Sequence, residues 1–285
     1  MGTGNQLVKV TGDPTLTTPS RENWAPPDID EAVPAVKPNV PCFLPEILSR
    51  AAARAEELRK NLQEFTASER IEHVEVGKHG KEHAPKSATF TYVAQIHKVS
   101  PGAMDIDEYR NGSTSESFPA NLATTGTAAH ALIFHPDVIG DFSVSCEGLG
   151  NVHGQPAWQL RFAQRPGRSL RFREYRTPRG WFDVKLKGRA WIAADNYQVI
   201  RMETDLAEPV PQIRLWKDHV VIDYRPVEFR SRHFQLWLPE TTDIYMDFLG
   251  HRSHRRHSFS DFRLFAVDVA EQIEYPKEAA APSPR

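Results

Sequence analysis

The feature that most constrains the fold is a series of short segments, beginning after residue 65, in which apolar and polar residues alternate. Phe90, Tyr92 and Ile96 share one face in the first clear case, and Trp158 and Phe162 share one in a later case. A period of two is typical of strands with one buried face. Further segments of this kind follow at 181–186, 189–193, 198–204, 213–216, 219–224, 235–238, 243–248 and 258–267. Their spacing leaves no room for crossover helices of a dozen or more residues, so the sheet should be antiparallel.

One amphipathic helix precedes these strands. Its apolar stripe, with alternating steps of four and three, consists of Leu44, Leu48, Ala51, Ala55, Leu58, Leu62 and Phe65. Pro45 suits the first helical turn, where its missing N–H has no partner to lose. A second, short helix is expected over residues 127–135. The predicted fold class is therefore α+β and predominantly antiparallel β, with the first helix packed on the sheet.

Composition divides the chain into three parts. Residues 1–41 form a proline-rich linker or arm, expected to be largely irregular, because proline removes backbone donors and restricts its neighbours. Residues 42–268 are expected to form a single β domain, and residues 269–285 a flexible tail.

Charge and hydropathy exclude several classes of partner. The 35 Lys and Arg residues and 37 Asp and Glu residues give a net charge of -2, so no global field attracts nucleic acid. No apolar run approaches the roughly 18 residues of a membrane span. The first nine residues lack the apolar stretch of a signal peptide, so the chain is either cytoplasmic or incomplete at its N-terminus.

The two cysteines, Cys42 and Cys146, are too few for a zinc site, which normally takes four Cys and His ligands. Two separate buried thiols are the favoured interpretation. A disulfide is the alternative, and it would indicate an oxidising compartment. No cofactor is expected.

A basic run at residues 251–257 contains three histidines and three arginines. We interpret it as an exposed turn between a strand that ends at Phe248 and one that begins at Ser258. Arg252, Arg255 and Arg256 are the candidates for binding an anion such as a lipid phosphate, since they would repel a divalent cation.

Catalytic motifs are absent. No G-x-S-x-G elbow, phosphate-binding loop or H-E-x-x-H sequence occurs, so no catalytic residue is assigned and a metal-dependent hydrolase is the least favoured alternative. Basic and aromatic residues are interleaved over residues 161–189, as in single-strand nucleic-acid binders. Outward-facing side chains of half-buried strands produce the same pattern and are the favoured interpretation.

The final strand has apolar residues on both faces. Phe259, Phe265 and Val267 have one parity, while Phe262 and Leu264 have the other. An antiparallel sheet normally exposes one face to water, so a helix, a partner or an apolar ligand is expected to cover the second face.

Three passages resemble a family of bacterial envelope domains. The first is the helix at residues 44–65 followed by the start of a strand, Thr66–Glu69. The second is a hairpin at residues 188–203, with Trp191 on one strand, an Asp turn and Arg201 on the return strand. The third joins residues 236–239 to residues 259–265. Together they look like the superfamily of the outer-membrane lipoprotein carrier (LolA-like).

This resemblance implies a curved half-barrel sheet with both helices against its concave face, in the periplasm or cell envelope. It also implies a non-enzymatic domain that accommodates a lipid, or a lipoprotein acyl chain, between sheet and helices. The candidates for lining such a cavity are Phe90, Tyr92, Trp158, Phe162, Trp191, Trp237 and Phe262. The alternative is a protein-interaction module at the end of a longer repeat-containing protein, with another envelope protein as its partner.

Overall fold

The fold is built on one antiparallel sheet of ten strands. The computed structural model describes residues 9–11, 24–61, 64–77, 80–100, 103–115, 118–119, 127–167, 173–177, 180–229 and 234–264. The expected tail at residues 269–285 and most of the first 23 residues lie outside these ranges.

The predicted segments correspond to strands, but 213–216 and 219–224 belong to one strand, as do 235–238 and 243–248. Beyond residue 65, three strands were not predicted, at 103–111, 142–152 and 174–177. The helical elements are α1 (Leu44–Asn61), η3 (Thr127–Phe134), η4 (Ile139–Asp141) and η5 (Pro211–Ile213). The strands are β1 (Lys9–Thr11), β2 (Ala32–Pro34), β3 (Glu64–Val76), β4 (Lys86–Ser100), β5 (Ala103–Asn111), β6 (Phe142–Val152), β7 (Gln155–Gln164), β8 (Glu174–Thr177), β9 (Gly180–Asp183), β10 (Leu186–Ala193), β11 (Val199–Leu206), β12 (Leu215–Phe229), β13 (Phe234–Phe248) and β14 (His251–Leu264).

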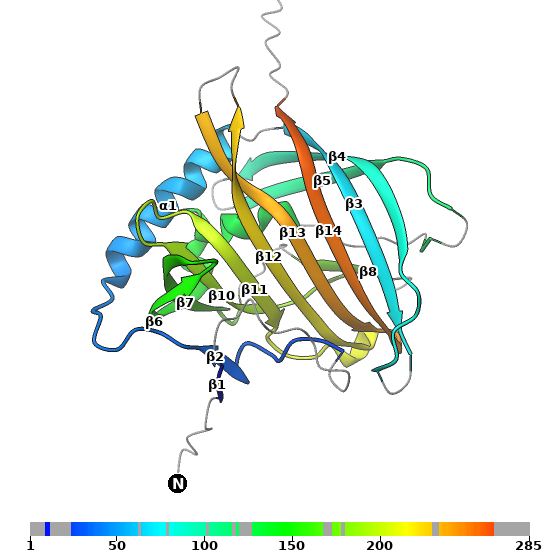
Figure 1. Ribbon diagram of the computed structural model, residues 1–285, viewed down its shortest axis with the longest axis horizontal. Helices are drawn as coiled ribbons and strands as arrows, with labels where there is room; N and C mark the ends of the chain where they lie inside the picture. The colour runs from blue at the N-terminus through cyan, green and yellow to red at the C-terminus, as the bar shows by residue number, and fades with distance from the viewer. Residues whose placement is uncertain are drawn as a thin grey trace, which may run out of the picture.

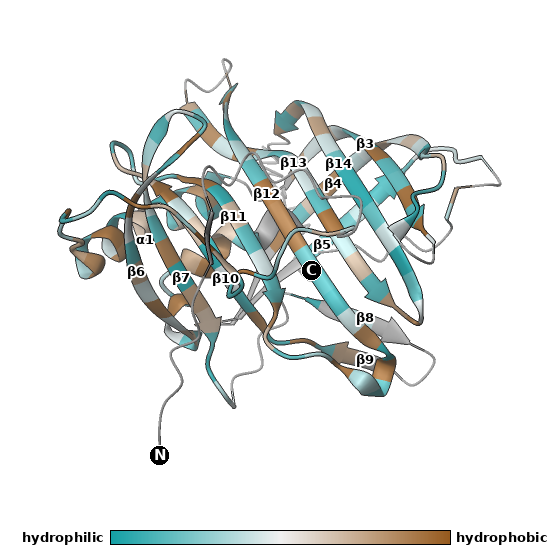
Figure 2. Ribbon diagram, turned by 60° about the horizontal axis from the view of Figure 1, so that its bottom comes forward, coloured by the Kyte–Doolittle hydropathy of each residue, from teal (hydrophilic) through white to brown (hydrophobic). Residues whose placement is uncertain are grey.

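The large sheet has the strand order β5-β4-β3-β14-β13-β12-β11-β10-β7-β6 and does not close. All its neighbouring strands are antiparallel. It curves around α1, as Figure 1 shows. Teal and brown bands follow one another along its strands in Figure 2, which is the alternation read from the sequence. The predicted fold class, a curved half-barrel with helices on its concave face, is therefore confirmed.

The concave face holds the main apolar core. Helix α1 buries Ile47, Ala51, Ala55 and Leu58 in this core. The small alanines let the helix lie close to the sheet, so its buried stripe includes Ile47 and leaves Leu44 and Leu48 at the margin. The short helix expected at residues 127–135 is present as η3, a 3-10 helix. In the described part of the chain, no helix is both long and apolar enough to cross a membrane.

The residues before α1 are held against the convex face of the sheet. Lys187 Nζ lies 2.8 Å from both Asp28 and Asp30, and Arg189 donates to the Ile29 carbonyl at 3.0 Å. A side chain at Gly148 would collide with Val36, since a Cβ there would lie 2.9 Å from it. The part of the proline-rich arm that is described, from residue 24 onward, thus follows the sheet closely although it is mostly irregular.

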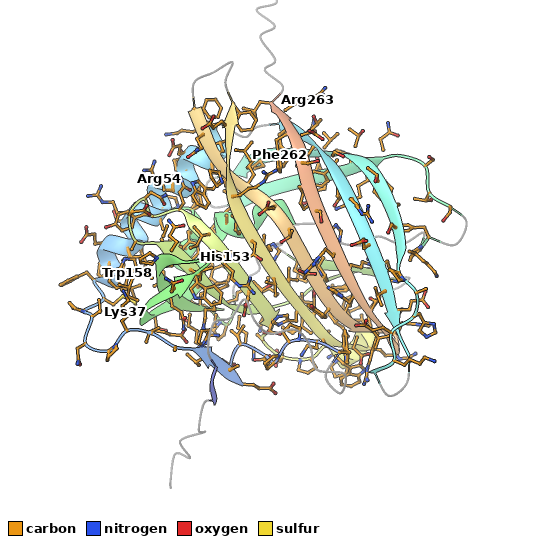
Figure 3. All side chains as sticks on the ribbon, in the orientation of Figure 1. Lys37, Arg54, His153, Trp158, Phe262 and Arg263 are labelled. Carbon is orange, nitrogen blue, oxygen red and sulfur yellow. A yellow bond between two sulfur atoms is a disulfide. The ribbon has the colours of Figure 1, made fainter. Side chains whose placement is uncertain are left out.

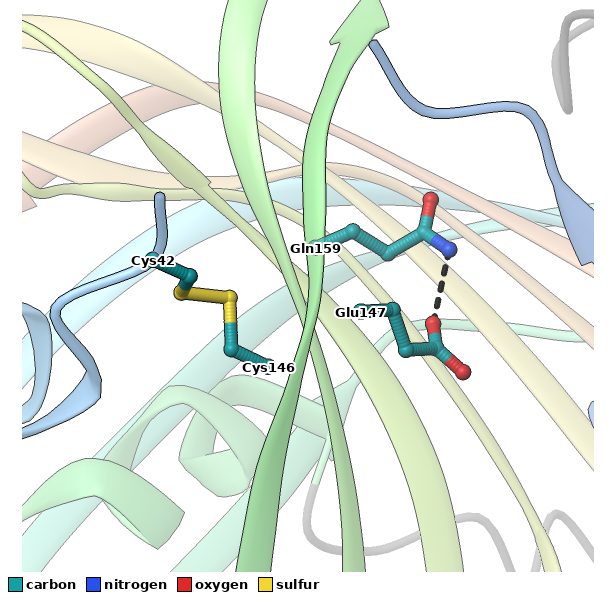
Figure 4. The surroundings of a disulfide bond; sticks show 4 residues. All are labelled: Cys42, Cys146, Glu147 and Gln159. Carbon is teal, nitrogen blue, oxygen red and sulfur yellow. Dashed lines mark hydrogen bonds between the residues drawn. A yellow bond between two sulfur atoms is a disulfide. The ribbon is translucent and has the colours of Figure 1, made fainter. Parts of the chain in front are cut away.

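A disulfide joins Cys42, just before α1, to Cys146 on β6 (Figure 4). The two Cα atoms lie 6.4 Å apart. The interpretation of two separate thiols was wrong, because the curvature of the sheet brings β6 to the start of α1. The bond fixes the arm and the first turn of the helix to the edge strand β6.

Removing this disulfide should destabilise the fold strongly. The bond closes a loop with a sequence separation of 104 residues, and loops of this length restrict the unfolded chain most. A variant with both Cys42→Ala and Cys146→Ala should lose about 2–4 kcal/mol of unfolding free energy in urea titrations. The unmodified chain in a reducing agent should shift by a similar amount, and a double variant as stable as the oxidised chain would contradict this account.

Candidate functional site

The candidate site begins where strands β13 and β14 separate. They pair from Phe248↔His251 to Thr241↔Ser258 and no further. Beyond that point, residues 234–240 of β13 stay with β12, while residues 259–264 of β14 stay with β3. Figure 1 shows the upper ends of β13 and β14 diverging. We call these two unpaired stretches, 234–240 and 259–264, the split.

Local irregularities on both strands explain the split. Pro239 has no N–H to donate to a neighbouring strand. The register of β13 with β12 shifts beside it, because Tyr224 pairs with Pro239 while Asp223 pairs with Thr241. On β14, Asp261 has a positive φ of 53° at another register shift. Such bulges bend a strand away from its partner.

The split has apolar walls. Leu236 and Leu238 on β13 and Phe259 on β14 are buried in the main core. Phe234 and Phe262 pack against that core but remain half-buried. Figure 3 places Phe262 near the upper end of β14. Partly exposed aromatic side chains that continue a buried core are typical of binding sites for apolar groups.

The same bulge corrects the expectation that the final strand is apolar on both faces. Phe259 and Phe262 have opposite parity, yet both pack into the main core. The extra residue at Asp261 resets the alternation, so the apolar residues on both sides of the bulge face inward. Phe265 and Val267 lie outside the described residues.

Just below the split, Thr242 and His257 form an inward-facing cross-strand pair. We call this pair the vertex. Both side chains are fully buried. Among the described residues, neither Thr242 Oγ1 nor His257 Nε2 has a hydrogen-bond partner. Buried polar atoms are normally paired, so two neighbouring unpaired atoms indicate a place for a polar group from outside the chain.

Glu69 orients His257. His257 Nδ1 lies 2.7 Å from a Glu69 carboxylate oxygen, and Arg110 donates to both oxygens at 2.6 and 2.9 Å. Burial alone would raise the pKa of Glu69, but these hydrogen bonds lower it below its usual value. Burial lowers the pKa of His257, and Glu69 does not offset this effect. The stable combination at neutral pH is an ionised Glu69 and a neutral His257 that donates from Nδ1.

A second buried polar cluster lies further along the concave face. Arg173 donates to both carboxylate oxygens of Asp218, at 2.7 and 2.9 Å, and Tyr175 donates to Asp218 at 2.6 Å. Nearby, Arg255 donates to His73 Nδ1 at 3.0 Å. These contacts join the β8 segment to the sheet by charged groups rather than by apolar packing alone.

The residues predicted to line a cavity do not all lie together. Tyr92 and Phe162 belong to the main core, with Trp158 and Phe262 at its margin. The remaining three lie elsewhere. Phe90 packs in a small cluster with Ile71 and Phe118. Trp191 lies on the convex face, where it donates to Gln159, and Trp237 contacts both the apolar cluster around Trp191 and the main core. Trp191 is thus excluded from the concave face by strand alternation, since its neighbours Ala190 and Ile192 occupy that face.

The basic run was wrongly interpreted as a turn. The turn is Leu249–Gly250, and the run itself lies inside β14. Arg252 pairs with Asp247, and Arg256 with Asp243. Arg255 is buried on the other face, so the structure does not bring the three arginines together.

Other charged residues singled out from the sequence also have protein partners. Within the basic region 161–189, Arg161 pairs with Asp30 and Arg173 with Asp218. His254 contacts Asp243. In the described ranges, no group of three or more His, Cys, Asp or Glu residues is arranged to hold a metal ion.

The vertex was not found from the sequence, although one signal was available. His257 has the same parity as Phe259, which places it on the apolar face of its strand. The same signal was available for the other two residues, since Thr242 shares its parity with Ile244 and Met246 and Glu69 shares its parity with Phe65 and Ile71. The sequence does not show which strands become neighbours, so it could not bring the three residues together.

Comparison with known proteins finds distant structural similarities. No protein-family description and no curated protein matches the sequence. Solved structures with a similar fold include a DUF1329 family protein from Desulfovibrio piger, at 12% identity and a TM-score of 0.44 over 80% of this chain and 94% of that one. A LolA superfamily protein from Nitrosomonas europaea has 13% identity and a TM-score of 0.41, with 77% and 94% covered. An outer membrane lipoprotein-sorting protein domain from Vibrio parahaemolyticus has 10% identity and a TM-score of 0.44, with 79% and 93% covered.

The protein from Nitrosomonas europaea is described as a member of the superfamily that the sequence resembles. These likenesses concern the fold, and they assign neither a ligand nor an activity to this chain.

The buried histidines should make stability fall between pH 6.5 and 4.5. Burial lowers the pKa of His73 to about 4, so the unfolded chain binds a proton in this range that the folded chain does not. The free energy of unfolding should therefore drop by about 2 kcal/mol as the pH falls from 6.5 to 4.5. The lowered pKa of His257 adds to the effect, while Glu69 takes up its proton only at lower pH. Urea titrations of His73→Gln should show a much shallower pH dependence than the unmodified chain, and equal slopes would refute the assignment.

Proposed function

We propose that this chain is a non-enzymatic binding protein for an apolar ligand such as an acyl chain, which enters at the split and lies against the concave face. The observation that carries the proposal is the separation of β13 from β14, with partly exposed aromatic side chains leading into the main core. A regular sheet would pair these stretches. Here an apolar chain can contact both walls without breaking a backbone hydrogen bond between them.

Two further observations support the proposal and the compartment that goes with it. The lipoprotein-carrier superfamily, which the sequence resembles, implies an acyl chain as the ligand. The Cys42–Cys146 disulfide is typical of an oxidising compartment, so we propose a location in the cell envelope.

A charge placed in the split should weaken binding of an apolar ligand. We expect Phe262→Glu to lower the affinity for a fluorescent fatty-acid analogue roughly tenfold, since a carboxylate on this wall must lose water when the ligand arrives. Trp216→Glu is the matched control, because Trp216 is also a large aromatic residue on a strand but is exposed and lies at the far end of β12. Its affinity should equal that of the unmodified chain.

Native mass spectrometry of protein purified under mild conditions provides an independent test. We expect co-purified acyl species on the unmodified chain and on Trp216→Glu, and much less on Phe262→Glu. A clean apo mass together with no response to fatty acids would overturn the proposal, as would an equal loss of affinity in the two variants.

A further inference from the structure

We infer that the vertex is a seat for a hydroxyl group, so that the ligand is an apolar molecule with a neutral alcohol at the end that reaches deepest into the split. This inference rests on the proposed function. It is carried by Thr242 Oγ1 and His257 Nε2, two buried and unpartnered polar atoms on facing residues of neighbouring strands. They lie one residue pair below the last pairing of β13 with β14, where the two apolar walls meet.

Glu69 determines that His257 Nε2 is the hydrogen-bond acceptor of this seat. Its ionised carboxylate lies 2.7 Å from His257 Nδ1, so the proton of the neutral imidazole sits on Nδ1. Nε2 then carries a lone pair directed into the interior. The tautomer is fixed further by Arg110, which occupies the two carboxylate oxygens and keeps Glu69 in place.

The donor is the hydroxyl of Thr242. A threonine hydroxyl can donate one hydrogen bond and accept others. Together the two residues offer one acceptor and one donor, which is the complement of an alcohol: its O–H donates to His257 Nε2 and its oxygen accepts from Thr242.

The same geometry disfavours an anionic end group. A carboxylate has only acceptors and would face the lone pair of Nε2. The three nearby arginines already donate hydrogen bonds within the protein: Arg110 to Glu69, Arg173 to Asp218, and Arg255 to His73. Carboxylates therefore neutralise Arg110 and Arg173 before a ligand arrives, whereas Arg255 donates to a neutral imidazole. A negatively charged end group at the vertex would lose its water and face the lone pair of His257.

The position of the vertex sets the orientation of the ligand. The walls above it, formed by Leu238 and Phe259 and then by Phe234 and Phe262, are apolar up to the margin. An alcohol seated at the vertex therefore places its hydrocarbon chain along these walls, with the far end at the half-buried rim.

The experiment compares hexadecanol with hexadecyl methyl ether, which has the same chain but no O–H, by displacement of a fluorescent fatty-acid analogue. The unmodified chain should bind the alcohol roughly tenfold more tightly than the ether. Thr242→Val keeps the shape of the side chain and should abolish this preference. Thr241→Val is the matched control, because its side chain points to the opposite face, and it should preserve the preference.

A second readout does not depend on any substitution. The nitrogen chemical shift of His257 Nε2 should move when the alcohol binds and stay unchanged when the ether binds. Equal binding of alcohol and ether by the unmodified chain would mean that the vertex holds an internal water only, which overturns the seat while leaving the proposed function intact. An equal weakening of both ligands by Thr242→Val would also overturn the seat, and failure of the unmodified chain to bind either ligand would overturn the proposed function itself.

Discussion

The architecture depends on one seam of backbone hydrogen bonds. Strands β5, β4, β3 and β14 form one half of the sheet, and β13 to β6 form the other half. The halves meet only where residues 241–248 face residues 251–258. The seam is anchored by a tight turn at Leu249–Gly250, where both residues have positive φ. Below the split this seam makes the sheet continuous, and its end defines where the interior becomes accessible.

Much of the fold follows from local pattern. The period of two predicts most strands, and the stripe from Leu44 to Phe65 predicts α1, because each pattern reflects a single buried face. The stripe was predicted too long, since α1 ends at Asn61 and Phe65 lies on β3. The site depends on departures from these patterns. One extra residue at Asp261 reverses the parity of the residues that follow it. A prediction that assumes regular alternation along the final strand therefore assigns the wrong face to the residues on one side of this bulge.

The sequence also could not show which residues far apart along the chain become neighbours in the fold. Cys42 and Cys146 become neighbours only through the curvature of a sheet that neither residue helps to specify. The arginines of the basic run illustrate the same limit, since a strand distributes them to opposite faces while a turn would have gathered them. Charge alone does not distinguish these arrangements. The neighbours Asp243 and Asp247, which neutralise two of the arginines, are supplied by the preceding strand.

Strands β3 and β14 are neighbours in the large sheet, although along the chain they are its first and its last strand. Residues 64–76 therefore emerge from the ribosome long before residues 251–264, and one edge of β3 has no partner until residues 251–264 have emerged. Exposed strand edges are the parts of an incomplete protein that associate wrongly with other chains. The Cys42–Cys146 bond, by contrast, can form once residue 146 has reached an oxidising compartment, before strands β7 to β14 follow. Such a bond would hold β6 beside the start of α1 while the remaining strands find their places, so the cross-link that strengthens the finished protein also restricts the unfinished one.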